Sequence, residues 1–472
     1  MIGRSSQIKK MHVLISQKKS SFLAVTGRRR VGKTHLVDEI YQKQLCLRVT
    51  GIQDANMKTQ IVNFAQKLAE YSNKPIISLP QNWQELMLLL KTYLQSLSKT
   101  KKQVIFIDEL PWVATKRSGF IQQLAHLWND YLSKEKNFIL VICGSATSWI
   151  TKRVLNDKGG FHNRVTDHIK LRPFNLAETK EFLMSRDIRL TDQAITELYM
   201  VIGGIPYYLE QIKKGLSVSQ IISQLCFSDD GILKYEYENL YKALFEHSEN
   251  HEAIVATLAK HTGGLSRSDI ILKSKVEAGG PYTRAMEDLL MSGFVDEIVP
   301  FGKRKRGATY RLMDEYSIFY HKFIFPNRKK DKDIWTTISN SQKYRIWTGF
   351  AFETVCHRHV NEIKNALGIA GVFTEHYSFR MKGDKSKTGL QIDLILDRKD
   401  DAINLCECKY YNDDVTISKD YATKLRQRRQ GFIHKVGTKK SVFNTLITSY
   451  GITKNAYYHD VVDQHLSVSD LM

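Results

Sequence analysis

Short apolar runs, each ending in polar or glycine-rich residues, recur along the first 174 residues of the chain. Amphipathic stretches at 59–71 and 83–97 lie between these runs and predict helices. The run Val104-Ile105-Phe106-Ile107 shows no polar alternation, which is typical of a parallel strand buried on both faces. The pattern therefore predicts an α/β core, a parallel sheet flanked by helices. Its predicted strands are 21–26, 45–49, 104–108, 138–143 and 167–171.

The pattern changes after residue 174 and predicts further segments. Asn175 and Glu178 have the spacing of a capping box, which predicts the first helix of a helical lid. Farther along, three short helices followed by two strands have about the size of a winged helix-turn-helix. The predicted segments are the α/β core at 1–174, the lid at 175–245, the winged helix-turn-helix at 246–326, a charged linker at 327–345 and an α/β C-terminal domain at 346–472.

The first strand leads into the sequence Gly27-x-x-x-x-Gly32-Lys33-Thr34, and an amphipathic helix follows. This is the context that a phosphate-binding loop requires, because backbone N–H groups then point inward at the positive end of the helix dipole. We expect Lys33 to reach the β- and γ-phosphates of ATP and Thr34 to ligate Mg²⁺. The predicted nucleotide-binding residues of the loop are Gly27, Arg28, Arg29, Arg30, Val31, Gly32, Lys33 and Thr34.

Two acids, Asp108 and Glu109, follow the buried run at 104–107. We expect Asp108 to hold Mg²⁺ through water and Glu109 to polarise the attacking water. A strand inserted between the phosphate-loop strand and the acidic strand is typical of the P-loop ATPases that carry a catalytic glutamate. Beyond the strand at 138–143, Ser145 or Thr147 is the candidate for sensing the γ-phosphate.

Additional candidates for the nucleotide site come later in the chain. Lys152, Arg153 and Arg164 are candidates for an arginine-finger role, with Arg164 slightly preferred, and each is equally explained as a surface cation. The sequence Gly203-Gly204-Ile205-Pro206 ends one helix and starts another. Its functional interpretation places Pro206 and the lid helix against the nucleotide, and its structural interpretation is a plain helix corner.

Composition favours a polyanionic partner. The 472 residues include 70 Lys and Arg against 49 Asp and Glu, a net charge of +21. This excess favours nucleic acid first and an acidic membrane second, although a Lys-rich solvated surface explains the charge about as well as nucleic-acid binding does. The six cysteines lack metal-ligand spacing and are expected to be reduced thiols. Without a membrane-length apolar run or a signal peptide, we expect a cytoplasmic protein and no membrane partner; the oligomeric state is not predicted.

The segment at 246–326 holds the candidate DNA-reading residues. In a winged helix, Tyr282, Thr283 and Arg284 on the third helix would enter a major groove, while the basic loop Lys303-Arg304-Lys305-Arg306 would contact phosphates. The alternative is a protein-docking module whose charges are only solvated, so a protein partner also remains open.

The C-terminal segment brings charged residues onto neighbouring strands. Glu407 and Lys409 share one face of a predicted strand, and Asp393 lies on the strand before it. Two carboxylates and a lysine arranged in this way can bind Mg²⁺ or Mn²⁺ and activate a water. A basic helix follows, with cations that either line a DNA cleft or form a solvated face: Lys424, Arg426, Arg428 and Arg429.

Two family resemblances follow from these motifs. The first half resembles the archaeal-type ATPases of the STAND branch of the AAA+ group, although Phe161-His162-Asn163-Arg164 stands where that family often has Tyr-Gly-Arg. The motifs that carry this resemblance are Ile2-Gly3-Arg4, the loop 27–34, Asp108-Glu109, Cys143-Gly144-Ser145 and Gly203-Gly204-Ile205-Pro206.

The sequence Asp393-x₁₃-Glu407-x-Lys409 resembles the PD-(D/E)xK restriction-endonuclease-like fold, with Ile392 where the motif has proline. The resemblance implies that Asp393 and Glu407 are metal ligands, that Lys409 is an electrophilic or water-orienting residue, and that Glu353 is an accessory catalytic ligand.

Together, these features predict an ATPase whose nucleotide state controls a DNA-binding, metal-dependent nuclease-like C-terminal half. The alternative is a STAND-type signalling or scaffold ATPase whose C-terminal domain binds nucleic acid or protein without cutting it. A small-molecule P-loop kinase is disfavoured by the implied strand order.

Overall fold

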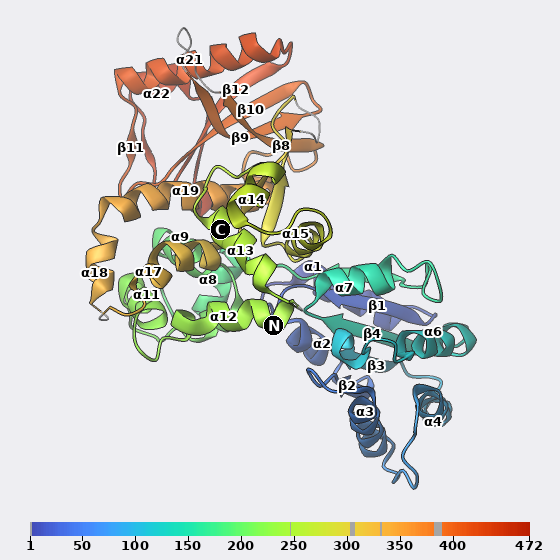
Figure 1. The fold of residues 1–472 in the computed structure, drawn as a ribbon. Coiled ribbons are helices and arrows are strands. Elements are labelled where there is room, and N and C mark those ends of the chain that lie inside the picture. The colour runs from blue at the N-terminus through green and yellow to red at the C-terminus, as the bar shows by residue number, and fades with distance from the viewer. Residues whose placement is uncertain (1, 246, 303–306, 331–332, 382–388) are drawn as a thin grey trace. The chain divides into compact units, whose positions relative to one another are not determined.

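The computed structural model describes residues 2–245, 247–302, 307–330, 333–381 and 389–472, and it divides the chain into two units, Met1–Pro173 and Phe174–Met472. The first unit is built on a parallel five-stranded sheet in the order β2-β3-β4-β1-β5 (Figure 1). Its strands are β1 (Ser21–Thr26), β2 (Leu45–Thr50), β3 (Gln103–Asp108), β4 (Phe138–Gly144) and β5 (Asp167–Lys170). The parallel sheet predicted from the apolar runs is confirmed, with β4 inserted between β1 and β3 as expected.

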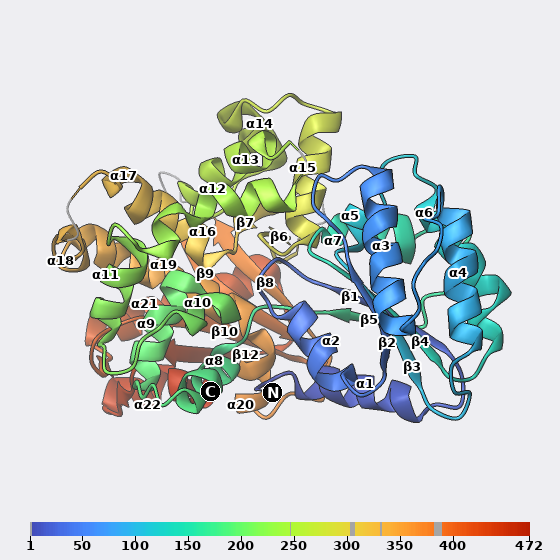
Figure 2. The same ribbon diagram turned by 90° about the horizontal axis from the view of Figure 1, so that it is seen from below.

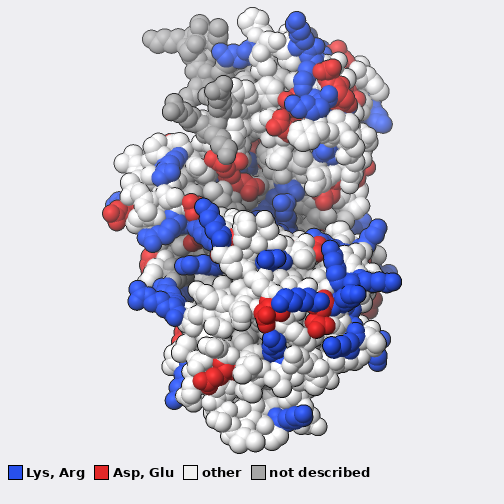
Figure 3. Space-filling model, turned by 90° about the vertical axis from the view of Figure 1, so that its right-hand side faces the viewer, with Lys and Arg blue, Asp and Glu red and all other residues white. Residues whose placement is uncertain are grey.

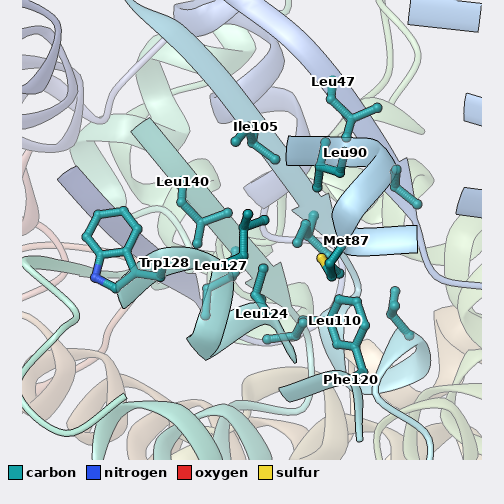
Figure 4. Packing of buried hydrophobic residues seen from close by; sticks show 14 of the residues in the cluster. Leu47, Met87, Leu90, Ile105, Leu110, Phe120, Leu124, Leu127, Trp128 and Leu140 are labelled. Carbon is teal, nitrogen blue, oxygen red and sulfur yellow. The ribbon is translucent and has the colours of Figure 1, made fainter. Parts of the chain in front are cut away.

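Helices cover both faces of this sheet (Figure 2). One face packs against α3, α4 and α6 in a cluster whose members include Leu47, Leu90, Phe120 and Trp128 (Figure 4). β1, β3 and β4 are therefore buried along almost their whole length, as their apolar runs suggested, whereas β5 buries only Ile169 of its four residues because its sequence is mostly polar. The helices of this unit are α1 (Ser5–Ser16), α2 (Lys33–Tyr41), α3 (Met57–Ser72), α4 (Trp83–Gln95), α5 (Leu110–Val113), α6 (Phe120–Asp130) and α7 (Thr147–Ile150).

The second unit begins with helices. The predicted capping box is present, because the Asn175 side chain accepts from the Glu178 N–H and the Glu178 carboxylate accepts from the Asn175 N–H. Pro206 starts α10, and Gly204 lies so close to Phe174 that an added Cβ would sit 1.9 Å from its carbonyl oxygen. The helices of this part are α8 (Leu176–Ser185), α9 (Asp192–Ile202), α10 (Pro206–Glu210), α11 (Val218–Cys226) and α12 (Ile232–Leu244).

Three helices and an antiparallel hairpin follow. Ser266 caps the middle helix by accepting from the Asp269 N–H. The prediction that the Tyr282 side chain reads a major groove is wrong. The side chain is only 1% exposed, because it lies on the face of its helix that packs into the interior. The elements are α13 (Glu249–Ala259), α14 (Arg267–Ser274), α15 (Gly280–Met291), β6 (Val295–Ile298) and β7 (Thr309–Leu312).

Helices also occupy much of the segment predicted as a charged linker. Trp335 in α18 is 2% exposed and stacks on Phe227 with ring centroids 5.5 Å apart. Apolar contacts therefore fix this stretch, although its charged start shows no apolar periodicity. The elements here are α16 (Glu315–Phe319), α17 (Phe325–Asn327), α18 (Ile334–Ser339) and α19 (Gln342–Arg358).

A mixed five-stranded sheet ends the chain, in the order β14-β12-β10-β9-β8. Helix α19 lies on one side of it and α21 on the other (Figure 1). The sequence predicted β9 and β10, whereas β8, β12 and β14 were not foreseen. The elements are α20 (Val360–Ala366), β8 (Thr374–Met381), β9 (Leu390–Arg398), β10 (Ala402–Lys409), β11 (Val415–Thr416), α21 (Lys419–Val436), β12 (Ser441–Thr448), β13 (Ile452–Thr453), α22 (Ala456–Val461) and β14 (Gln464–Ser467).

Charged side chains of both signs lie on the surface, whereas the cysteines lie in the interior. Lys and Arg side chains are spread over much of the face drawn in Figure 3, with Asp and Glu among them. All six cysteines are buried and unpaired with one another. Across the described ranges, no helix has the length and apolar character needed to cross a bilayer.

Candidate functional site

The loop after β1 has the backbone that a phosphate-binding loop needs. Gly27 has φ +150°, and a Cβ there would lie 2.3 Å from the carbonyl oxygen of Leu171; Gly32 has φ +87°. Both positions therefore favour glycine. Helix α2 starts at Lys33, whose Nζ donates to the Arg28 carbonyl oxygen at 3.0 Å. Arg28 and Val31 are buried, while Arg29 and Arg30 are half-buried.

The loop is tied to the acidic strand by one side-chain hydrogen bond. Thr34 Oγ1 donates to Asp108 Oδ2 at 2.9 Å, and the Glu109 N–H donates to Asp108 Oδ1 at 3.0 Å. Asp108 is only 4% exposed. A hydroxyl and a carboxylate in contact are the oxygen donors that Mg²⁺ prefers. The donor chemistry of Thr34 and Asp108 thus suits the magnesium site expected of them.

Glu109 is held at the end of β3 in an unusual conformation. Its φ is +47°, the left-handed region that non-glycine residues rarely adopt. Glu109 Oε2 accepts from both the backbone N–H and Oγ of Ser145, each at 3.0 Å. Of the two hydroxyls proposed as a sensor, Ser145 is therefore the one in contact with the predicted catalytic glutamate. Backbone strain of this kind concentrates at functional sites.

Arg4 contacts the loop, and the sequence reasoning missed this role. The residue has φ +64°, is 6% exposed, and donates from Nη2 to the Val31 carbonyl oxygen at 3.2 Å. The available signal was the Ile2-Gly3-Arg4 motif, which served in the sequence analysis only as part of the family resemblance. Arg4, in the segment before α1, thus holds the phosphate loop through this hydrogen bond.

The remaining nucleotide-site candidates are less central. Lys152, Arg153 and Arg164 are all exposed, so the choice of an arginine finger stays a prediction. Pro206 is buried at the start of α10 in the second unit, and its contact with nucleotide also stays a prediction.

A second group of acidic residues lies in the C-terminal sheet, where a β-bulge sets the position of Asp393. The register of β9 against β8 slips between the pairs Tyr377–Ile395 and Phe379–Ile392, so β9 carries one extra residue there. Asp393 Oδ2 accepts from the Cys408 N–H of β10 at 3.1 Å. Bulges of this kind are frequent beside active sites because they re-aim a side chain.

Glu407 on β10 is surrounded by donors. Lys409 Nζ lies 2.8 Å from Oε1, and Arg428 of α21 forms an ion pair with Oε2 through Nη1. Tyr421 also donates its hydroxyl to Oε1, at 3.4 Å. Although burial lowers the pKa of Lys409, its contact with Glu407 outweighs that effect, and the net pKa is raised. The predicted Glu407–Lys409 pair on one strand face is present in the structure.

Glu353 of α19 joins this electrostatic group. Burial, and then the charge of Asp393, raises the pKa of Glu353 to about 8. Burial, and then the charge of Glu407, raises the pKa of Asp393 to about 6. Each carboxylate thus disfavours ionisation of its neighbour, as expected when like charges share a site of low polarity. We call Glu353, Asp393 and Glu407 the carboxylate cluster.

Arg311 reaches Glu353 from the hairpin strand β7. Its Nη2 donates to Thr354 Oγ1 at 2.7 Å and to the Phe350 carbonyl oxygen at 3.3 Å, and lies 4.0 Å from Glu353 Oε2. Burial lowers the pKa of Arg311, while Glu353 and Asp393 oppose that effect. This link between the hairpin and the carboxylate cluster was not predicted, because nothing local to Arg311 marks its partner.

The carboxylate cluster has the donor chemistry of a divalent-metal site. Its oxygens are the ligands that Mg²⁺ and Mn²⁺ prefer, and a cation there would relieve the repulsion between Asp393 and its neighbours. Even so, the residues that the structure describes include no group of three His, Cys, Asp or Glu placed to hold a metal ion. Because Lys409 and Arg428 already pair with Glu407, its oxygens are engaged by cations from the chain itself.

Comparison with known proteins clarifies the first site. A sequence model of the family described as "ATPase domain predominantly from Archaea" matches residues 1–212. Residues 1–212 are thus similar to a family of ATPase domains. The phosphate loop, Asp108, Glu109 and Ser145 all lie inside the matched region. The similarity supports ATP binding by this part of the chain.

Individual relatives are more distant. A protein of Methanocaldococcus jannaschii, named uncharacterized protein MJECL04, is 24% identical over 401 residues, covering 84% of this chain and 83% of that protein. The Walker-type ATPase PABY2304 of Pyrococcus abyssi is 16% identical with a TM-score of 0.48, covering 68% of this chain and 96% of its own. The ORC2 protein of Aeropyrum pernix is 11% identical with a TM-score of 0.42, covering 68% and 92%. At this distance, the solved structures identify neither a substrate nor a partner of this chain.

The buried contact of Arg311 gives a stability prediction. Replacing Arg311 by Met leaves Glu353 and Thr354 without their buried donor, so we expect the free energy of unfolding to fall by about 3 kcal/mol. Urea unfolding of the full chain, followed by tryptophan fluorescence, measures the change. The control is Arg345→Met at an exposed position of α19, the helix that carries Glu353, and its stability is expected to stay within about 0.5 kcal/mol of the parent. Equal stability of the two variants would contradict a structural role for the Arg311 guanidinium.

Proposed function

We propose that the chain hydrolyses ATP at the phosphate loop and that its nucleotide state controls a DNA-binding, metal-dependent nuclease-like C-terminal half. The observation that carries the first part is the meeting of four side chains from the start of α2 and the ends of β3 and β4. Thr34 is bonded to Asp108, and Ser145 is bonded to Glu109, the neighbouring residue of the chain. Phosphate contacts, metal-binding oxygens and a general base thus gather at one edge of the sheet.

In this proposal each residue of the ATP site has one task. Backbone N–H groups at the start of α2 and the Lys33 ammonium bind the phosphates. Bound Mg²⁺, held by Thr34 and by Asp108 through water, would neutralise charge on the β- and γ-phosphates. Glu109 orients a water and accepts its proton, and Ser145 fixes the Glu109 carboxylate through two hydrogen bonds.

The nuclease-like part rests on the carboxylate cluster. Asp393 and Glu407 lie on adjacent strands and Glu353 faces them from α19, which are the positions implied by the PD-(D/E)xK resemblance. In the proposal, Asp393 and Glu407 hold a divalent metal, with Glu353 as an accessory ligand. That metal would activate the attacking water, and Lys409 would orient it or stabilise charge on the phosphate.

DNA binding is proposed for the helices and hairpin of 246–326. Their order, three helices and then an antiparallel pair, supports a winged helix-turn-helix. Arg284 is exposed on α15 and Thr283 is half-buried beside it, so these two remain available to a groove. The basic loop 303–306 lies outside the described residues. The charge of +21 is the remaining support.

The second candidate function is a STAND-type signalling or scaffold ATPase that does not cut DNA. The observation that favours it is the pairing of Glu407 with both Lys409 and Arg428, together with the absence of a three-ligand metal group among the described residues. In that case the carboxylate cluster is a structural ion network, and the C-terminal half binds nucleic acid or protein.

The ATP site is tested by Lys33→Ala. The change removes the ammonium that contacts the phosphates, so we expect at least about a tenfold loss of ATP affinity and of turnover. Titration with a fluorescent ATP analogue and a phosphate-release assay measure both quantities. Lys43→Ala, at an exposed position after α2, should match the parent. Retained affinity and turnover in Lys33→Ala would move the nucleotide site away from this loop.

The nuclease-like site is tested by Asp393→Ala. Supercoiled DNA is incubated with Mg²⁺ or Mn²⁺, with and without ATP, and nicking is scored on a gel. We expect nicking by the parent, an effect of ATP on its rate, and about a hundredfold loss in Asp393→Ala, because the metal loses a ligand. The exposed Asp413→Ala should cut like the parent. Absence of nicking by the parent under every condition would favour the scaffold function.

A further inference from the structure

Two chain cations occupy the two oxygens of Glu407. Lys409 contacts Oε1 at 2.8 Å, and Arg428 contacts Oε2. The Glu407 side chain is only 7% exposed, so water contributes little to its solvation. A buried carboxylate needs such partners to remain charged. Lys409 and Arg428 therefore balance the charge of Glu407 without a metal ion.

The two cations differ in how firmly they are held. Lys409 lies two residues from Glu407 on the same strand, so the strand itself keeps the pair together. Arg428 comes from α21, and its side chain is 26% exposed, close to the 29% of Lys409, so the two differ in their connection to Glu407 along the chain and not in exposure. A long arginine stem at a partly exposed helix position can move its guanidinium into solvent by rotamer changes alone. Arg428 is thus the partner that can leave without unfolding the sheet.

The neighbouring arginines of α21 pair with acids outside the carboxylate cluster, unlike Arg428. Arg426 forms an ion pair with Asp460, and Arg429 lies 3.3 Å from Asp463. Both of those acids belong to the segment around α22, outside the carboxylate cluster. Among these three arginines, Arg428 alone contacts an acid of the carboxylate cluster in the described part of the chain.

Arg428 and a divalent cation would compete for Glu407. A metal ligated by Asp393 and Glu407 needs a lone pair of the Glu407 carboxylate, and the guanidinium occupies Oε2. Two like charges at one buried carboxylate also repel each other strongly.

We propose that Arg428 is the counter-cation of Glu407 as long as no metal is bound to the carboxylate cluster. When a divalent metal binds Glu407, Arg428 moves to a phosphodiester of the bound DNA. The proposal rests on the proposed nuclease-like function. A guanidinium matches the geometry of phosphate oxygens as well as that of a carboxylate, so one side chain serves both partners. Arg428 thereby couples metal binding to DNA binding at the same site.

The first test is Mn²⁺ binding to the full chain, measured by the electron paramagnetic resonance signal of free Mn²⁺. Removing the competing charge in Arg428→Gln should tighten binding at the carboxylate cluster by at least about fivefold. Arg426→Gln, two positions earlier on the same helix, should stay within about twofold of the parent because its partner is Asp460. The gain should disappear in Arg428→Gln/Asp393→Ala, which distinguishes this metal from one at the ATP site.

Unchanged or weaker Mn²⁺ binding in Arg428→Gln would overturn the proposal, as would a gain that persists without Asp393. The variant Arg428→Lys, which keeps a cation on the helix, should bind Mn²⁺ like the parent and guards against a folding artefact. In the second test, Mn²⁺-dependent DNA affinity should fall in Arg428→Gln but not in Arg426→Gln; equal affinities would refute the phosphate step. Because neither readout is cleavage, a gain in Mn²⁺ binding without any nicking would sustain the proposed exchange while rejecting the nuclease.

Discussion

The hydrogen bond between Thr34 and Asp108 is the contact on which the ATP site depends. It joins the helix that follows the phosphate loop to the end of the acidic strand, so the N–H groups proposed to bind phosphate and the oxygens proposed to bind metal are held in a fixed arrangement. The loop can make this connection because Gly27 and Gly32 adopt backbone angles that other residues avoid. Glu109 is then positioned by chain continuity with Asp108 and by its contact with Ser145.

The ATPase core could be predicted well from the sequence because its signals are local. β3 and β4 contain unbroken apolar runs, and the proposed site residues stand at the ends of such runs or inside a glycine-framed loop. The strand order also followed, with β4 between β1 and β3. Arg4 was not assigned to the loop, since its bond to Val31 joins residues 27 positions apart and only the fold brings them together.

The C-terminal half was less predictable because its contacts are long-range. The Asp393, Glu407 and Lys409 pattern could be read from two strands, but the bulge that sets Asp393 depends on pairing with β8, which the sequence did not reveal. Arg428 lies in a basic stretch that looks solvated but pairs with Glu407, and Arg311, on a strand whose sequence gives no sign of a partner, is buried against Glu353. Tyr282 shows the converse error, since a helix position chosen for DNA contact faces the interior.

The most direct test of the account is the ATP turnover of Glu109→Gln, compared with Glu39→Gln at an exposed position of α2. Glutamine keeps the shape of the side chain but cannot accept the proton of the attacking water. The account predicts that Glu109→Gln binds ATP with the affinity of the parent and loses turnover by about a hundredfold or more, while Glu39→Gln is unaffected. Turnover of Glu109→Gln at the parental rate would contradict the assignment of Glu109 as the base.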